Sequence, residues 1–268
     1  MDSKEWFEII YYKKDLIIIR EKLSEIDPRY HTEYSNIFLI NGSIKSMLID
    51  TGSGLFPLKS IIENLIDGRD LIVINTHSHF DHIGSNNEFD EVYIHEKELN
   101  KINKSIDISF LKDSPKEIVT KYKNIDFTLK PAKRINTIKE GDIFDLGEIQ
   151  VKTVHCAGHS EGSLSLYTDR GELFTGDSAH YGAMYLPSLD NLSIFIKMIQ
   201  KLIRFCNENN LNQLFPSHEI YFTNKDLLIE LIDSLNKIKA LWKFKNRDDF
   251  NNSWVIDTDK FKFMVKMD

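Results

Sequence analysis

The sequence is poor in cysteine, has no long apolar run and lacks an excess of positive charge. Its two cysteines among 268 residues cannot form a disulfide framework, and no stretch approaches the roughly 18 apolar residues that a membrane span needs. The first residues, MDSKEWFEIIYY, have no basic start followed by an apolar stretch, so they do not resemble a signal peptide. The formal net charge of -7 argues against a nucleic-acid surface. We therefore expect a cytoplasmic protein that acts on a small molecule, with neither a membrane nor a nucleic acid as partner.

Hydrophobic residues make up 41% of the chain, enough for a substantial core. The first half begins with β-branched or aromatic runs that predict adjacent antiparallel strands, and it continues with a helical pattern and a buried strand. The second half repeats this order. Strands followed by a helix, twice, favour an α/β fold in which two sheets pack face to face with helices outside. The expected strands lie at 7–12, 15–20, 36–40, 45–50, 70–76, within 134–177 and at 212–219, and the expected helices at 57–66 and 191–206.

Two segments depart from this pattern. Residues 96–134 are weakly patterned and rich in Lys and Asn, which indicates an insertion between the halves. Residues 244–268 form a C-terminal extension, in which residues 253–267 are typical of a hairpin. We expect one domain over residues 1–268, and an exposed hairpin edge of this kind is a surface through which a homodimer could pair.

Three histidines and an aspartate crowd into the stretch NTHSHFDHIG, directly after the expected strand at 70–76. Side chains alternate along an extended segment, so His77 and His79 point the same way and could share one metal ion. Asp81 and His82 follow where we expect the chain to turn into a helix, and they face a different point. Because zinc takes about four ligands, two ions at this loop would need further donors from elsewhere.

Loops after later strand-like runs supply such donors: His159 in CAGHSEGS, Asp177 in LFTGDSA and His218 in LFPSHE. With these stretches in this order, and LIDTG upstream, the sequence resembles the metallo-β-lactamase superfamily over roughly residues 35–220. The resemblance implies a four-layer αββα sandwich of two mixed β-sheets flanked by helices, with metal ions at one edge between the sheets.

The resemblance also implies a role for each donor. A water molecule between two metal ions loses a proton near neutral pH and becomes a nucleophile, a metal-bridging hydroxide. Asp81 could in addition relay a proton, and Asp50 would accept the second N–H of a ligating histidine. Two zinc ions are expected, with iron or manganese as alternatives; the first would bind His77, His79 and His159, the second Asp81, His82 and His218, and Asp177 would bridge them.

Two tyrosines follow the expected bridging aspartate in DSAHYGAMY. Tyr181 is a candidate catalytic phenol that donates a hydrogen bond to a developing oxyanion, and packing beneath the loop is the alternative for it and still more for Tyr185. Cys156 and Cys206 are interpreted as buried structural thiols.

The resemblance leaves the substrate open. A bridging hydroxide needs only an electrophile, so we predict a dinuclear hydrolase of a small carboxylic ester, thioester or lactone. The common zinc β-lactamases have cysteine at the position of Asp177, which argues against antibiotic hydrolysis. The alternatives are a phosphodiesterase of the same fold, a mononuclear iron dioxygenase of the persulfide type, and a metal-binding module without catalysis.

Overall fold

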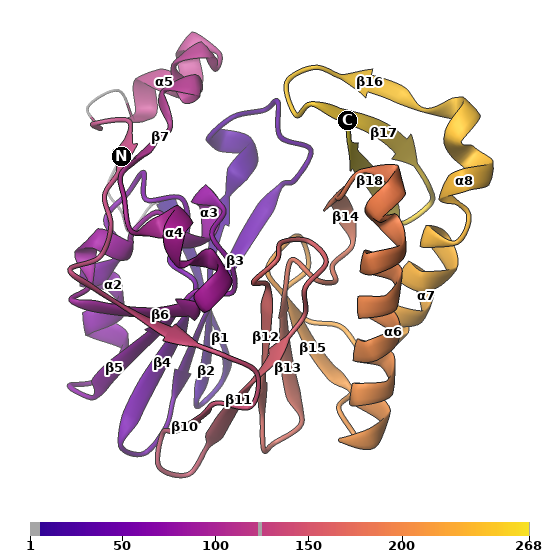
Figure 1. Ribbon diagram of the computed structural model, residues 1–268. Coiled ribbons are helices and arrows are strands. Elements are labelled where there is room, and N and C mark those ends of the chain that lie inside the picture. The colour runs from indigo at the N-terminus through magenta and orange to yellow at the C-terminus, as the bar shows by residue number, and fades with distance from the viewer. Residues whose placement is uncertain (1–5, 123–124, 268) are drawn as a thin grey trace.

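The computed structural model describes residues 6–122 and 125–267 and is built of β-sheets with helices on their outer faces (Figure 1). A mixed sheet has the strand order β1-β2-β3-β4-β5-β6-β9, and a second mixed sheet has the order β10-β11-β12-β13-β15. A further sheet, of order β14-β18-β17-β16, contains most of the C-terminal segment, and β7 pairs with β8.

The strands are β1 (Phe7–Lys13), β2 (Leu16–Lys22), β3 (Tyr34–Asn41), β4 (Lys45–Ile49), β5 (Asp70–Ile74), β6 (Glu91–His95), β7 (Ile106–Asp107), β8 (Thr128–Leu129), β9 (Arg134–Ile138), β10 (Ile143–Asp145), β11 (Gln150–His155), β12 (Leu164–Thr168), β13 (Glu172–Gly176), β14 (Gly182–Leu186), β15 (Gln213–Pro216), β16 (Asn246–Asp248), β17 (Ser253–Asp257) and β18 (Phe261–Lys266). The α-helices are α2 (Lys59–Leu65), α3 (Phe80–Ile83), α4 (Leu99–Ile102), α5 (Lys116–Tyr122), α6 (Leu192–Glu208), α7 (Asp226–Leu235) and α8 (Ile238–Leu241). Short 3₁₀ helices are η1 (Leu23–Glu25), η2 (Asn86–Glu88), η3 (Glu96–Glu98), η4 (Ser109–Asp113), η5 (Leu189–Asn191) and η6 (Trp242–Phe244).

The first sheet is buried on both faces, as β2 illustrates. Ile17 and Ile19 pack in the outer core, which also contains Ile62 of α2. Ile18 faces the other way and packs in the core between the sheets, which also contains Phe174 of β13. Successive side chains of a strand point to opposite faces, so a continuous apolar run is what a central layer requires.

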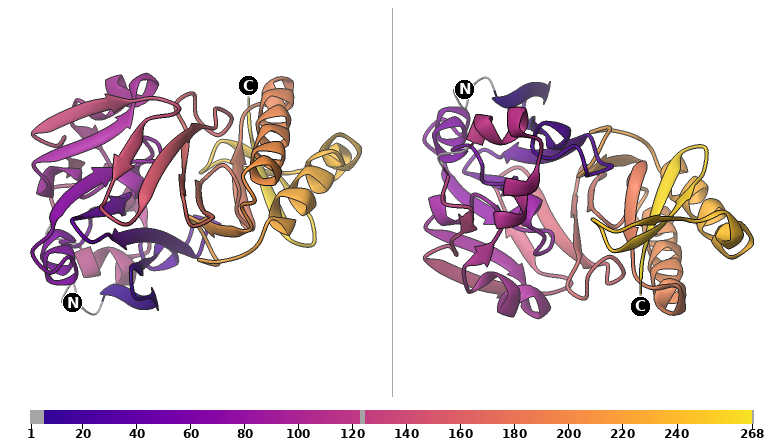
Figure 2. Two further views of the ribbon diagram at one scale, coloured as in Figure 1. Left: turned by 90° about the horizontal axis from the view of Figure 1, so that it is seen from below. Right: turned by 90° about the horizontal axis from the view of Figure 1, so that it is seen from above.

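The second sheet is covered by α6 and α7 on the side away from the first sheet (Figure 2). Phe195, Ile199 and Leu202 of α6 recur at helical spacing, are buried, and share a core with Leu173 of β13 and Leu214 of β15. This apolar stripe fixes which face of the helix meets the sheet. The order helix, sheet, sheet, helix confirms the predicted αββα sandwich.

The predicted C-terminal hairpin is present as β17 and β18, but its place in the fold differs from a simple sheet edge. Strand β18 pairs in parallel with β14, from Gly182 beside Phe261 to Leu186 beside Val265. The sequence pattern showed the hairpin but not this partner, because pairing between strands so far apart has no local signal. That the whole chain behaves as one domain stays a prediction.

No helix within residues 6–122 and 125–267 has the length and apolar character needed to cross a membrane.

Candidate metal centre

The predicted metal ligands lie on loops that meet at one edge of the two sheets. Strands β4 and β5 run parallel in the first sheet, and β13 and β15 run parallel in the second. Loops that leave the carboxyl ends of parallel strands meet at the same edge, which is where α/β proteins bind their ligands. Asp50 follows β4, the histidine-rich loop follows β5, Asp177 follows β13 and His218 follows β15.

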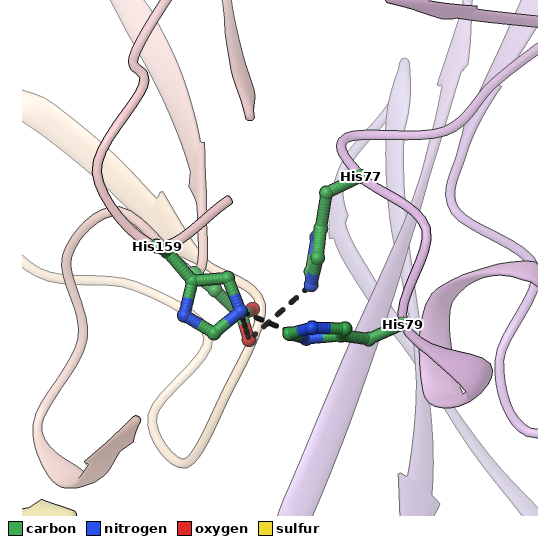
Figure 3. Close-up of side chains that lie close together, drawn as sticks. His77, His79 and His159 are labelled. Carbon is green, nitrogen blue, oxygen red and sulfur yellow. Dashed lines mark hydrogen bonds and ion pairs between the residues drawn. The ribbon is translucent and has the colours of Figure 1, made fainter. Parts of the chain in front are cut away.

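The first group of donors consists of His77, His79, His159 and Asp177, whose ligand atoms lie within 4.8 Å of one another. His159 faces His77 and His79 across the gap between the sheets, as Figure 3 shows. Nδ1 of His79 lies 2.9 Å from Nε2 of His159. Two imidazoles at this distance need either a proton or a cation between their nitrogen lone pairs.

The second group consists of Asp81, His82 and His218, which also have ligand atoms within 4.8 Å of one another. Oδ2 of Asp81 lies 3.6 Å from Nε2 of His82 and 3.6 Å from Nε2 of His218. The carboxylate of Asp177 lies between the two groups: its Oδ1 is 3.2 Å from Nε2 of both His82 and His218, and its Oδ2 is 3.2 Å from Nε2 of His218 and 3.5 Å from Nε2 of His159. The structure therefore brings together all the predicted ligands.

The rings of His159 and His218 are oriented by the protein backbone. Nδ1 of His159 lies 2.9 Å from the carbonyl oxygen of Tyr185, and Nδ1 of His218 lies 3.0 Å from that of Tyr34. A carbonyl oxygen only accepts, so each Nδ1 carries the proton and leaves Nε2 as the nitrogen that faces the cluster. Partners of this kind orient histidine ligands in metal sites.

The carboxylate of Asp50 orients the ring of His82. Its Oδ2 lies 2.8 Å from Nδ1 of His82, and its Oδ1 accepts the backbone N–H of Thr76 at 2.7 Å. Asp50 is buried and has a φ of 66°, a left-handed conformation that turns the chain at the end of β4. The contact predicted for this carboxylate is therefore present.

The donor set fits a metal ion on grounds of hydrogen bonding. Among the described residues, Nε2 of His77, Nε2 of His82 and Oδ1 of Asp177 are buried atoms without a hydrogen-bond partner. Buried polar atoms are normally satisfied, so three unpaired donor atoms within these two groups fit bound metal ions. Imidazole and carboxylate donors suit zinc, and they also suit iron or manganese.

The histidines of the two donor groups differ in their pKa values. Burial lowers the pKa of His77 well below its ordinary value and that of His79 to about 4. Burial acts on His218 in the same direction, but the carboxylate of Asp177 outweighs it and raises the pKa of His218 to about 9. At neutral pH the metal-free protein thus has neutral imidazoles in the first group and a proton to displace in the second.

The two tyrosines after Asp177 differ in position. The hydroxyl of Tyr181 donates to Glu230 at 2.7 Å, and its ring stacks on Phe261. Of the described residues that line the two cavities at the cluster, Tyr185 belongs to both and Tyr181 to neither. The position of Tyr181 therefore gives no support to its predicted role, since packing beneath the loop uses both its ring and its hydroxyl.

Sequence reasoning missed one residue that joins two ligand loops. Glu98, at the end of η3, is buried; it accepts a hydrogen bond from Ser78, between the two histidines of the first loop, and another from the N–H of Gly162 at 2.8 Å. Burial alone would raise the pKa of Glu98, but these bonds and the ammonium of Lys101 lower it, so the group is a carboxylate. A lone glutamate in the weakly patterned segment after β6 has no signal in the sequence that would single it out.

Other histidines and the two cysteines in the described part of the chain pack against their neighbours. His180 is buried and its ring contacts that of His218. His95 and His155 stack on each other outside both donor groups, with ring centroids 4.2 Å apart. Cys156 and Cys206 are buried free thiols, as interpreted from the sequence.

Two cavities open beside the donors. The smaller, of about 210 Å³, has walls formed by apolar and aromatic side chains, among them Leu23, Tyr30 and Phe80. The larger, of about 790 Å³, extends toward the C-terminal sheet and includes Lys101 and Lys266. An electrophile at the metal centre thus has a small apolar space on one side and a large mixed space on the other.

Comparison with known proteins agrees with this geometry. The sequence model of the metallo-beta-lactamase superfamily matches residues 32–241. The chain is similar to the acyl-coenzyme A thioesterase MBLAC2 of Gallus gallus, with 29% identity over 81% of this chain and 82% of the relative. It is also 32% identical to a probable metallo-hydrolase of Methanocaldococcus jannaschii, over 69% of this chain and 87% of the relative. Among solved structures, a metallo-beta-lactamase from Pontibacter korlensis has a TM-score of 0.60 at 16% identity, over 86% of this chain and 99% of that one, which shows a shared fold.

Proposed function

The chain belongs to the metallo-beta-lactamase superfamily, and from that premise we propose that it is a dinuclear metal-dependent hydrolase of small acyl thioesters. The position of the Asp177 carboxylate carries the proposal, since both its oxygens lie 3.2 Å from Nε2 of His218, while Oδ1 also lies 3.2 Å from His82 and Oδ2 lies 3.5 Å from His159. A single carboxylate placed between two groups of imidazoles is the arrangement that a ligand shared by two ions requires.

Zinc is the metal that we propose, with iron or manganese as alternatives for the same nitrogen and oxygen donors. His77, His79 and His159 would hold one ion, and Asp81, His82 and His218 the other, as assigned from the sequence. When bound, such a pair of ions supplies a water molecule of lowered pKa and polarises the carbonyl under attack.

Three side chains of the protein would act on the substrate or on protons. Asp81 has a side chain that is 14% exposed and lines the smaller cavity, so it can exchange a proton with a molecule held there. Tyr185 lines both cavities, and its hydroxyl donates a long hydrogen bond of 3.4 Å to Oδ1 of Asn251. Burial raises the pKa of this phenol, which therefore keeps its proton and would exchange the long bond for one to a developing oxyanion. The aromatic ring of Phe80 lines the smaller cavity and would help to exclude water from it.

The choice of a thioester rests on the relatives and on the cavities together. MBLAC2 of Gallus gallus is named an acyl-coenzyme A thioesterase, and the chain covers most of its length. The smaller cavity has an apolar lining suited to a hydrocarbon chain. Esters and lactones meet the same chemical requirement, and the relatives' names favour the thioester among them.

The direct test is thiol release from short acyl thioesters by the protein as purified, after chelation, and after zinc is restored. We expect turnover that is lost with the metal, regained with zinc, and absent in Asp177→Asn. Hydrolysis of bis-aryl phosphate without any thioester turnover would favour the phosphodiesterase, and oxygen uptake by a single bound iron would favour the dioxygenase. Tight metal binding without turnover on either substrate would favour a non-catalytic module.

A further inference from the structure

The larger cavity has a wall that the family match does not include. The matched residues end at 241, whereas Asn251, Asn252, Ser253, Met264 and Lys266 line the cavity from the C-terminal sheet. The side of the site that they form is therefore a feature of this chain beyond the part that identifies its family.

Backbone pairing fixes this wall beside the metal centre. Strand β14 follows the Asp177 loop, and Leu186 at its end pairs with Val265 of β18, directly before Lys266. Ser253 of β17 is in register with Lys266 from the other side. Because β18 is held between two strands, Lys266 has a defined place at the cavity rather than the freedom of a chain end.

The two cavities differ in both size and chemistry. Sites for drug-sized or cofactor-sized ligands usually measure about 300–1,000 Å³, a range that includes the larger cavity at about 790 Å³ but not the smaller one at about 210 Å³. The smaller cavity lies between predicted metal ligands and an aromatic wall, in which Tyr30 and Phe80 stack with ring centroids 5.6 Å apart. The larger is lined by Lys101, Lys266 and Glu161, and the ammonium of Lys101 also pairs with Glu98 at 3.0 Å.

The two cavities adjoin at the metal centre, because His79, His159 and Tyr185 line both, so a thioester placed there has room on each side. Hydrolysis forms a C–O bond from water and breaks the C–S bond, so that a carboxylic acid and a thiol are released. One half of the substrate is apolar, and the other, if the thiol is a phosphopantetheine, is long, polar and anionic. Lysine binds phosphate as a point charge, and the larger cavity provides two lysines.

We propose that the larger cavity binds the phosphorylated thiol part of the substrate, with Lys101 and Lys266 at its phosphates, and that the smaller cavity binds a short acyl chain. This inference rests on the proposed thioesterase function and adds the orientation of the substrate and the residues that recognise its leaving group. It also gives the C-terminal sheet a role in specificity.

The test compares butyryl thioesters of coenzyme A, of phosphopantetheine and of N-acetylcysteamine, which carry several, one and no phosphates. The readout is the ratio of kcat/KM for each phosphorylated substrate to that for the N-acetylcysteamine thioester. We expect Lys266→Gln to lower the coenzyme A ratio about tenfold, mainly through KM, and Lys266→Glu to lower it further. A fall with both phosphorylated substrates places Lys266 at the pantetheine phosphate, and a fall with coenzyme A alone places it at the nucleotide phosphates; either result supports binding of the thiol's phosphates in the larger cavity.

Lys133→Gln is the matched control, because Lys133 is exposed, pairs with Asp90 and does not line this cavity. Its ratio should stay within about twofold of wild type. A ratio that is unchanged in both Lys266 variants, while wild type hydrolyses all three thioesters, overturns the inference and leaves the proposed function standing. If the wild type hydrolyses none of the three thioesters, both the inference and the proposed function are overturned.

Chain-length preference tests the other half of the assignment. With coenzyme A as the common thiol, we expect kcat/KM to fall for long acyl chains, and Tyr30→Ala to shift the preference toward them by enlarging the smaller cavity. Wild-type activity that rises steadily with chain length would place the acyl group in the larger cavity and contradict the orientation.

Discussion

Oδ2 of Asp50 lies 2.8 Å from Nδ1 of His82, and the other nitrogen of the same ring faces Asp81 and Asp177. A carboxylate that binds the outer nitrogen of a histidine fixes its tautomer and its orientation, and it makes the inner nitrogen a better ligand. Asp50 therefore links the end of β4 to the second group of donors.

Asp50→Asn should weaken binding of the second metal ion by about 10–100-fold and lower kcat/KM by a similar factor. The amide keeps the size of the side chain but removes the charge that faces His82. Titration of the metal-depleted protein with zinc measures the loss. The control is Asp67→Asn, because Asp67 has a similarly positive φ and a side chain that is 92% exposed. Equal affinity in Asp50→Asn and wild type would refute the role of this contact.

Glu98→Gln should loosen the first group of donors, because Glu98 holds Ser78 and Gly162, which belong to the loops that carry the donors from both sheets. A buried carboxylate replaced by an amide leaves at least one donor without its charged acceptor, at a cost of about 1–3 kcal/mol in the free energy of unfolding. Chemical denaturation and zinc titration give the two readouts. The exposed neighbour Glu96, changed to Gln, is the control. A loss of stability with unchanged zinc affinity would make Glu98 a purely structural residue.

The metal-free protein should lose stability on both sides of about pH 6.5. The folded-state pKa of His79 is lowered by burial to about 4, so its contribution is present above the unfolded value of 6.5 and is lost as the pH falls toward 4. The folded-state pKa of His218 is raised by Asp177 to about 9, so its contribution is present below 6.5 and is lost as the pH rises toward 9.

Denaturant unfolding of the chelated protein between pH 5 and 9 tests this pattern. His218→Asn should reduce the loss of stability between pH 6.5 and 9. His31→Asn, at a surface pair with Asp248, should leave that loss as in wild type. If the free energy of unfolding falls as steeply with rising pH in His218→Asn as in wild type, other groups cause the loss.

Substitution of the two tyrosines after Asp177 should have different effects on stability and on kcat. Burial, followed by the neighbouring Glu230, raises the pKa of Tyr181 to about 12, and its hydroxyl already donates to that carboxylate. Tyr181→Phe should therefore lower stability slightly, by about 0.5–1.5 kcal/mol, and leave kcat within about twofold. Tyr185→Phe should lower kcat by about tenfold or more with little change in KM, because the phenol would act on the transition state. The opposite result would restore the role predicted for Tyr181.

The candidate donors could be located from the sequence because local rules place them, whereas their division between two ions came from the family resemblance. Alternation along an extended segment puts His77 and His79 on one side, and a loop after a strand puts Asp177 and His218 at a sheet edge. The amphipathic stripe of α6 was equally readable. Each of these signals lies within a few residues of the feature that it predicts.

What could not be predicted depends on contacts between distant segments. The bond from Glu98 to Gly162 and the pairing of β14 with β18 join residues that are far apart in the sequence. Tyr181 and Tyr185 have the same local context, and only the packing of the helices and the C-terminal sheet decides which ring lies at the cavities. Helix α7, absent from the expected elements, belongs to the second core through Leu227 and Leu231.

The most direct test of the central claim is the number of metal ions per chain, measured by elemental analysis of the purified protein and of Asp81→Ala and His218→Ala. A dinuclear centre predicts about two ions in wild type and about one in each variant, because the first group of donors stays intact. One ion per chain in all three proteins, or none, would contradict the dinuclear centre.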